Sequence, residues 1–196
     1  MALFKNQILL LAILLLFMLL QFKVIWPLES QLLEYSPFAV ASLLFLPHGV
    51  KAICVVLAGA RAIIPLFFVH LITDLAIGLS LVHGLTSGTV SVVTMMLPLL
   101  LINFLSHKPP FEPLTLGATA DLSLFRLVLV VAIISSLLNG TIGAIRYETN
   151  PLELVAFKYF TGDIGGTLVV LGLLLGLRRP LLGLARRVVK VDGQSR

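Results

Sequence analysis

Long apolar runs limit the fold of this sequence more than any other feature. A helix needs about 20 consecutive, predominantly apolar residues to cross a hydrocarbon core about 30 Å thick. The runs are longer than the strands of a membrane barrel, and they do not alternate polar with apolar residues as such strands do. We therefore predict an all-α integral membrane protein with about six transmembrane helices. The predicted spans cover residues 8–26, 37–59, 62–82, 89–105, 124–145 and 152–177.

The composition excludes several classes of protein. Of the 196 residues, 59% are hydrophobic and 12% are charged, whereas soluble domains average about 45–50% apolar and about 25% charged residues. A soluble globular enzyme, a disordered tail and a nucleic-acid-binding module are therefore excluded. The single cysteine, Cys54, lies within an apolar run, so neither an intramolecular disulfide nor a cysteine-based zinc site is expected. We predict no metal and no cofactor.

The positions of the basic residues predict the orientation in the membrane. Lys51 and Arg61 flank one turn, and Lys108 and Arg126 border the longest internal loop. All of these residues, and the basic tail, fall on one side if the N-terminus is cytoplasmic, as the positive-inside rule requires. We therefore predict that both termini are cytoplasmic, and we interpret the net charge of +5 as a topology signal. The predicted organisation is one membrane domain (residues 1–180) followed by a basic cytoplasmic tail (residues 181–196), which contacts anionic lipid headgroups or is simply solvated.

Ionisable side chains within the predicted spans form the candidate site, because a charge inside a bilayer is costly and needs a reason. The candidates are His48, Lys51, His70, Asp74 and Asp163. His70 and Asp74 are four residues apart and therefore share one face of a helix. With alternating topology, the two histidines and the two aspartates fall at a similar depth, near the bilayer midplane. We predict that this polar cluster binds a small-molecule ligand.

A purely structural role explains the same residues. Asp163 with Lys51, or Asp74 with Lys158, would form interhelical ion pairs that lock the bundle. His70 and Asp74 would form a local hydrogen bond in this interpretation, with no ligand involved.

A proline and a glycine, Pro47 and Gly49, interrupt the second span. Pro47 removes a backbone N–H and Gly49 adds flexibility, so we expect the second helix to be broken at Pro47–Gly49. The half-helix would then begin near His48 and point free N–H groups into the bundle, an arrangement that binds anions in transporters. The alternative is a simple proline kink that neighbouring helices repair.

The sixth span carries glycines on both sides of Asp163, and these glycines predict close helix packing. They are Gly162, Gly165 and Gly166. A carboxylate at such a crossing would be held rigidly against its partner.

These two motifs, in this order, resemble those of the bacterial membrane-associated sensor domain family (MASE type one). The matched positions are Pro47, Gly49, Gly162, Asp163 and Gly165. The resemblance implies an integral-membrane sensing module in the bacterial inner membrane, of a kind usually attached to a kinase or a cyclic-dinucleotide enzyme. This chain has Leu46 and Phe160 where the family commonly has tryptophans, and about six predicted helices where the family commonly has about eight. We expect a stand-alone, shortened version without an output domain.

Three functions fit these features. The first is a non-enzymatic sensor-like or accessory membrane protein that acts through a partner protein. The second is a substrate-binding membrane subunit of a small-molecule transporter, of the energy-coupling-factor type, which matches in size and helix number. The third is a structural subunit of a larger membrane complex. An enzyme is not expected, because the sequence has no HExxH motif, no serine–histidine dyad at a useful spacing and no paired-aspartate motif.

Overall fold

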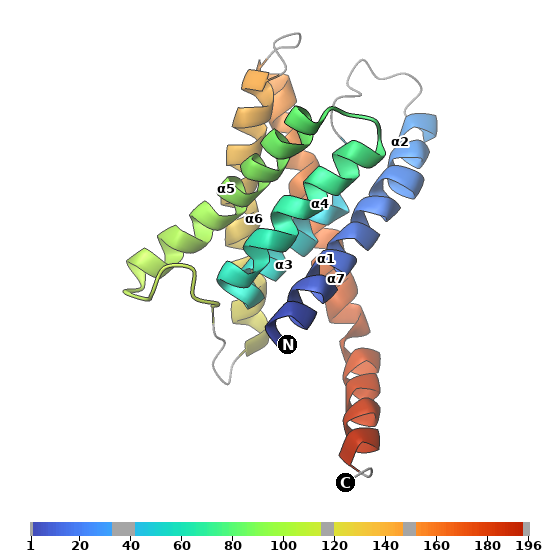
Figure 1. Cartoon of the computed structure of the whole chain (residues 1–196), viewed down its shortest axis with the longest axis vertical. Helices are drawn as coiled ribbons and strands as arrows, with labels where there is room; N and C mark the ends of the chain where they lie inside the picture. Colours follow the sequence, from blue (N-terminus) through green and yellow to red (C-terminus); the bar gives the residue numbers. More distant parts are fainter. Residues whose placement is uncertain (1, 33–41, 115–119, 147–151, 194–196) are drawn as a thin grey trace.

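The computed structural model describes residues 2–32, 42–114, 120–146 and 152–193, and every regular element in these ranges is a helix. The elements are α1 (Ala2–Leu20), η1 (Gln21–Ile25), α2 (Trp26–Leu32), α3 (Leu46–Ala58), η2 (Gly59–Ala62), α4 (Ile63–Ala76), α5 (Leu81–Leu105), α6 (Ala120–Arg146) and α7 (Leu152–Gly193). The prediction of an all-α protein is confirmed for the described residues. Figure 1 shows the helices as one elongated bundle, from which the end of α7 projects.

Five helical stretches are long and apolar enough to cross a membrane: Asn6–Leu32, Leu46–Ala76, Leu81–Leu105, Leu124–Gly143 and Ala156–Leu177. This is consistent with a multi-pass membrane protein. Two of the predicted spans, 37–59 and 62–82, correspond to the single stretch Leu46–Ala76, because the turn between them is itself helical. Residues 37–41 of the second predicted span lie outside the described residues. Large apolar side chains also cover the outside of the bundle, such as Phe104 (77% exposed) and Phe157 (65% exposed), as expected for a surface that faces lipid.

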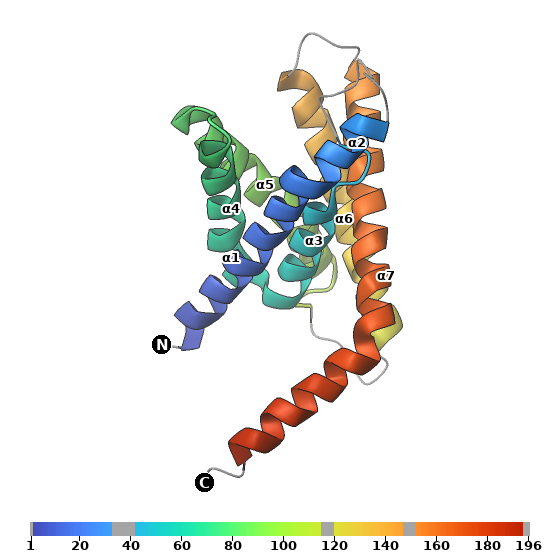
Figure 2. The ribbon, with the colours of Figure 1, turned by 90° about the vertical axis from the view of Figure 1, so that its right-hand side faces the viewer.

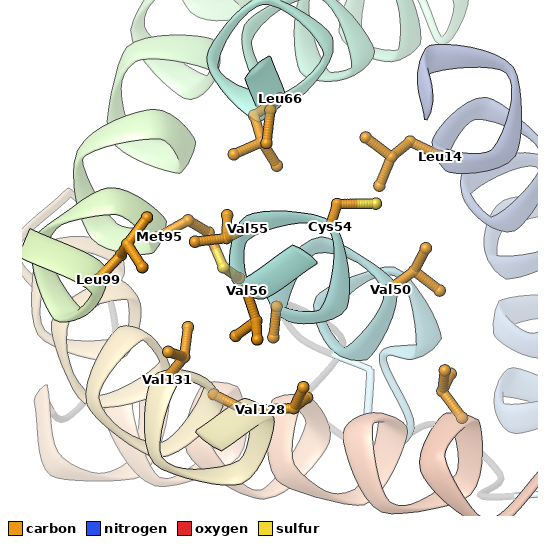
Figure 3. Packing of buried hydrophobic residues seen from close by; sticks show 14 of the residues in the cluster. Leu14, Val50, Cys54, Val55, Val56, Leu66, Met95, Leu99, Val128 and Val131 are labelled. Carbon is orange, nitrogen blue, oxygen red and sulfur yellow. The ribbon is translucent and has the colours of Figure 1, made fainter. Parts of the chain in front are cut away.

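The central helix is α3, which packs against α7, α6, α1 and α5. Figure 3 shows its apolar side chains within the core. They are surrounded by buried residues of α1, α4, α5 and α6; the labelled residues are Val50, Cys54, Val55 and Val56 on α3, with Leu14, Leu66, Met95, Leu99, Val128 and Val131 around them. Between helices in a bilayer there is little hydrophobic driving force, so this core contributes through van der Waals contact and close fit.

The chain reverses between α3 and α4 at Gly59 (Figure 1). Gly59 has φ +57°, a conformation that glycine adopts without a steric penalty. Its own N–H donates to the carbonyl oxygen of Val55, and the N–H of Ala60 donates to that of Phe111 at 3.0 Å. After the reversal α4 packs against α5 and α1, and a side-chain contact between Lys51 and His70 joins it to α3.

The predicted break in the second span lies earlier than expected. α3 begins at Leu46, so Pro47 and Gly49 belong to its first turn, and the non-helical residues described are 42–45. The physical reason is that proline is tolerated in the first turn, where its missing N–H has no partner to lose. Proline also disfavours helical geometry at the residue before it, so a helix seldom continues into a proline from the N-terminal side.

The glycines Gly84 and Gly88 were expected to separate the third and fourth spans, and this boundary is wrong. Both lie inside α5, where the backbone of α4 approaches them closely: a Cβ at Gly88 would lie 2.8 Å from the carbonyl oxygen of Phe67. The turn lies between Ala76 and Leu81 instead. It contains Gly78 with φ +85°, and Ser80 caps α5 by accepting a hydrogen bond from the N–H of His83 at 3.2 Å.

The last helix, α7, is 42 residues long and continues through the predicted domain boundary at residue 180. Its C-terminal part leaves the bundle at an angle (Figure 2). Pro180 lies within α7, and a proline inside a helix removes one backbone hydrogen bond and bends the axis.

Candidate functional site

The non-helical segment before α3, residues 42–45, lies directly on the glycines of α7. The N–H of Phe45 donates to the carbonyl oxygen of Gly162 at 2.9 Å. A Cβ at Gly162 or Gly166 would collide with the backbone of this segment, whereas at Gly165 it would lie at an ordinary van der Waals distance. Two of the three glycines thus permit a contact between two backbones that no other residue would allow.

Polar side chains of the first helical stretch bind the same segment from the other side. Gln21 is fully buried; its Nε2 donates to Oγ of Ser42 at 2.9 Å, and its Oε1 accepts from the N–H of Leu46 at 3.1 Å. Glu29 accepts from the N–H of Leu44 at 2.8 Å and from the hydroxyl of Ser42 at 2.7 Å. Gln21 begins the π-helical turn η1, a feature that is often found at functional sites.

The N-terminus of α3 is therefore not a free anion site. The N–H of Leu46 is bonded to Gln21, Pro47 has no N–H, and the N–H of His48 donates to the carbonyl oxygen of Phe45 at 3.2 Å. The expectation that a half-helix points unsatisfied N–H groups at a ligand is contradicted, because protein groups already occupy these positions.

His48 and Asp163 form a buried pair at the centre of the bundle. Nδ1 of His48 lies 3.0 Å from Oδ2 of Asp163, an ion-pair distance without good hydrogen-bond alignment. On the other edge of the ring, Nε2 lies 3.2 Å from the carbonyl oxygen of Ala132 and 3.0 Å from Oγ of Ser135. The amide of Asn139 also donates to Asp163, at 3.4 Å. Asp163 therefore contacts His48 of α3 and Asn139 of α6. The ion pair between Asp163 and Lys51 that the structural interpretation proposed is not formed.

Lys51 and His70 form a second polar contact, between α3 and α4. Nζ of Lys51 lies 3.1 Å from Nε2 of His70 and 5.5 Å from the centre of the Phe45 ring. Because an ammonium group can only donate, Nε2 of His70 accepts, and the ring proton is on Nδ1. Lys51 is only 3% exposed.

Asp74 lies near the end of α4, one turn beyond His70, and the ring of His83 on α5 lies within ion-pair distance of it. Nε2 of His83 lies 3.8 Å from Oδ2 of Asp74, and that oxygen is buried without a hydrogen bond. Oγ of the buried Ser91 is also without a hydrogen-bond partner. No hydrogen bond joins Asp74 to His70 in the described residues.

A cavity of about 240 Å³ connects these groups. Four of the five predicted site residues line it: Lys51, His70, Asp74 and Asp163. The fifth, His48, lies behind Asp163 and has no exposed surface. Aromatic rings of Phe22, Trp26, Phe45 and Tyr159 form part of the wall, and His83, Ser91 and Asn139 add further polar groups.

Sequence reasoning missed several polar residues of this site. The predicted spans 62–82 and 89–105 leave His83 in the connection between them, but it lies in the first turn of α5 against Asp74 because the turn comes earlier than predicted. Asn139 and Gln21 are uncharged, so a search for ionisable residues in apolar runs passes over them. A search for any amide side chain within a predicted span would have found both.

The site offers no metal-binding arrangement in the described part of the chain: no three histidine, cysteine, aspartate or glutamate side chains converge there. Comparison of the chain with protein-family models, with curated proteins and with solved structures finds no match in any of the three. The resemblance to membrane-associated sensor domains remains an expectation from the two motifs.

Proposed function

We propose that this chain is a non-enzymatic integral membrane protein that binds a small solute within its helix bundle and acts through a partner protein. The observation that carries the proposal is the cavity, in which two oppositely charged side chains, Lys51 and Asp74, are buried and line the same space. Buried charges are costly unless they are paired. A bundle whose polar residues served only to lock helices would be packed solid at this place.

We further propose six membrane crossings, with both termini on the cytoplasmic side of a bacterial inner membrane. α3 has 13 residues, which gives a length of about 20 Å, too short to cross alone. The four non-helical residues before it add up to about 13 Å, which brings the sum to the thickness of a hydrocarbon core. Both ends of the drawn chain lie at the same end of the bundle (Figure 1), in agreement with an even number of crossings.

In this orientation, the ligand enters from the outer side. The α4–α5 turn lies at the end of the bundle opposite the two termini (Figure 1), and its residues Ile77 and Leu79 line the cavity. Entry from outside suits a sensor-like protein, and it equally suits the substrate-binding subunit of a transporter. The partner distinguishes these two functions, since a transporter subunit requires an ATP-hydrolysing partner and a sensor requires a signalling enzyme.

The test is affinity purification from native membranes, with mass spectrometry of both the proteins and the small molecules retained. We expect the wild-type chain to retain a partner and a solute, and Asp74→Asn to retain the partner with less solute. Glu153→Gln, at an exposed position of α7, is the matched control and should behave as the wild type. Recovery of the wild-type chain alone, with neither partner nor solute, would contradict the proposal.

A further inference from the structure

We propose that the cavity takes a small zwitterion, with Lys51 binding its anionic group and Asp74 binding its ammonium group. This inference rests on the proposed function, because it names the class of solute that the same cavity binds. Four observations support it: the state of Lys51, the state of Asp74, their placement, and the volume and walls of the cavity.

Lys51 is a buried cation with no carboxylate in ion-pair contact among the described residues, and Asp163 attracts it only from a longer distance. No carboxylate oxygen of the described residues lies within 4 Å of its Nζ; the two carboxylates that form such contacts, Asp163 and Asp74, do so with His48 and His83. Its one hydrogen bond, to His70, engages a single proton of an ammonium group that carries three. The remaining donors are available to an anion in the cavity that Lys51 lines.

Asp74 is a buried carboxylate with one oxygen that has no hydrogen bond. The residue is 8% exposed, and its Oδ2 is buried without a hydrogen bond, although it lines the cavity. The His83 ring nitrogen at 3.8 Å is beyond hydrogen-bond distance. A buried carboxylate oxygen in this state strongly favours a cationic donor. Oγ of Ser91, also buried, unpartnered and part of the wall, adds a neutral hydrogen-bonding group.

The placement of the two charges fits both ends of one small molecule. Lys51 contacts His70 on α4. Asp74 follows His70 by one helical turn, so the Cβ atoms of His70 and Asp74 are about 6 Å apart. A lone anion would leave Asp74 unpaired and would be repelled by it, and a lone cation would do the same at Lys51. A molecule with both charges satisfies both groups, and the pair of His48 and Asp163 needs no further charge.

The cavity volume has room for a small solute. About 240 Å³ is enough for a solute on the order of eight to ten non-hydrogen atoms. The rings of Phe22 and Trp26, whose centres lie 5.4 Å apart, form an apolar wall for an uncharged side chain. Small amino acids with apolar side chains meet these requirements.

The experiment measures binding to the purified full-length chain by thermal shift and calorimetry. The zwitterionic probes are the neutral α-amino acids, β-alanine and γ-aminobutyrate. L-leucine has two matched analogues of the same shape: 4-methylpentanoate lacks the ammonium group, and 3-methylbutylamine lacks the carboxylate. We expect at least one zwitterion to bind, and its two single-charge analogues to bind at least about tenfold more weakly, because each leaves one buried charge unpaired.

Variants test the assignment of each charge. Asp74→Asn should weaken binding of the zwitterion at least about tenfold, and it should improve binding of the deaminated analogue relative to the zwitterion, since the repulsion of the anion is gone. Lys51→Gln should likewise weaken binding of the zwitterion, and it should improve binding of the decarboxylated analogue relative to the zwitterion. Thr141→Val, at an exposed position of α6, is the control and should bind as the wild type. The change of preference in Asp74→Asn requires a folded protein, so it cannot arise from unfolding.

The outcomes separate this inference from the proposed function. Binding of a monocarboxylate, of inorganic phosphate or of an amine as tightly as any zwitterion would overturn the zwitterion assignment while leaving a solute-binding protein. Absence of binding by every probe of either kind would overturn the inference and count against the proposed function. Binding of a zwitterion that is unchanged in both Asp74→Asn and Lys51→Gln would place the ligand outside this cavity.

Discussion

Nδ1 of His48 on α3 lies 3.0 Å from Oδ2 of Asp163 on α7, and both side chains are almost fully buried. The carbonyl oxygen of Ala132 lies 3.2 Å from Nε2 of the same ring, and a carbonyl oxygen can only accept. The Ser135 hydroxyl lies 3.0 Å from Nε2 and can donate to it, so a ring that carries its proton on Nδ1, toward the carboxylate, is satisfied on both edges. This pair connects the central helix to both α6 and α7.

Removal of either partner should destabilise the bundle strongly, and removal of both should cost less than the sum. We expect His48→Leu and Asp163→Ala each to lower the free energy of unfolding by about 3 kcal/mol, because each leaves one buried polar partner unpaired. The double variant should lose about 2 kcal/mol less than the sum of the two. Equilibrium unfolding in detergent measures all three. Strictly additive losses would show that the two side chains do not interact.

The close contact between α7 and residues 42–45 predicts opposite effects for two glycines of the same helix. A Cβ at Gly166 would collide with the backbone of Phe45, so the backbone of α7 or of residues 42–45 would have to move. We expect Gly166→Ala to lower the free energy of unfolding by about 1–3 kcal/mol. Gly172 has no atom within 4 Å of such a Cβ, so Gly172→Ala should leave stability unchanged or raise it by up to about 1 kcal/mol. Equal effects of the two substitutions, measured by detergent unfolding, would contradict this packing.

The buried amide of Gln21 should matter more than its exposed counterpart. Gln21→Leu leaves the N–H of Leu46 and the hydroxyl of Ser42 with one bond fewer each, which we expect to cost about 1–3 kcal/mol. Gln31→Leu makes the same chemical change at an exposed position and should be nearly neutral. Melting temperatures of the two purified variants measure the difference. A Gln21→Leu variant as stable as the wild type would show that the first helical stretch does not hold residues 42–45.

The topology predicts the activity of reporter fusions. With both termini cytoplasmic, green fluorescent protein should fluoresce at either end of the chain, whereas alkaline phosphatase should be inactive there. Alkaline phosphatase inserted after Gly78, in the α4–α5 turn, should be active because that turn faces outward. Active phosphatase at the C-terminus together with fluorescence at the N-terminus would require an odd number of crossings and would overturn the proposed orientation.

Periodicity and charge predicted the helical class well, but they placed glycines poorly. In the sequence, Gly84 and Gly88 look like a loop, as does any pair of glycines between two apolar runs. Their role inside α5 is to permit close packing against α4, because a Cβ at Gly88 would collide with the backbone and ring of Phe67. The prediction for the glycines around Asp163 named close packing, yet it could not name the partner, which is a non-helical segment rather than a helix.

The sequence by itself determined that this chain forms helices long and apolar enough to cross a membrane, because apolar runs of that length are a local property. It also identified Lys51, His70, Asp74 and Asp163 as unusual, since an ionisable residue in an apolar run is visible without a structure. The tertiary structure alone decided the partners. Which carboxylate is hydrogen-bonded within the protein, as for Asp163, and which keeps an oxygen without a hydrogen bond at the cavity, as for Asp74, depends on contacts between helices that are distant in sequence.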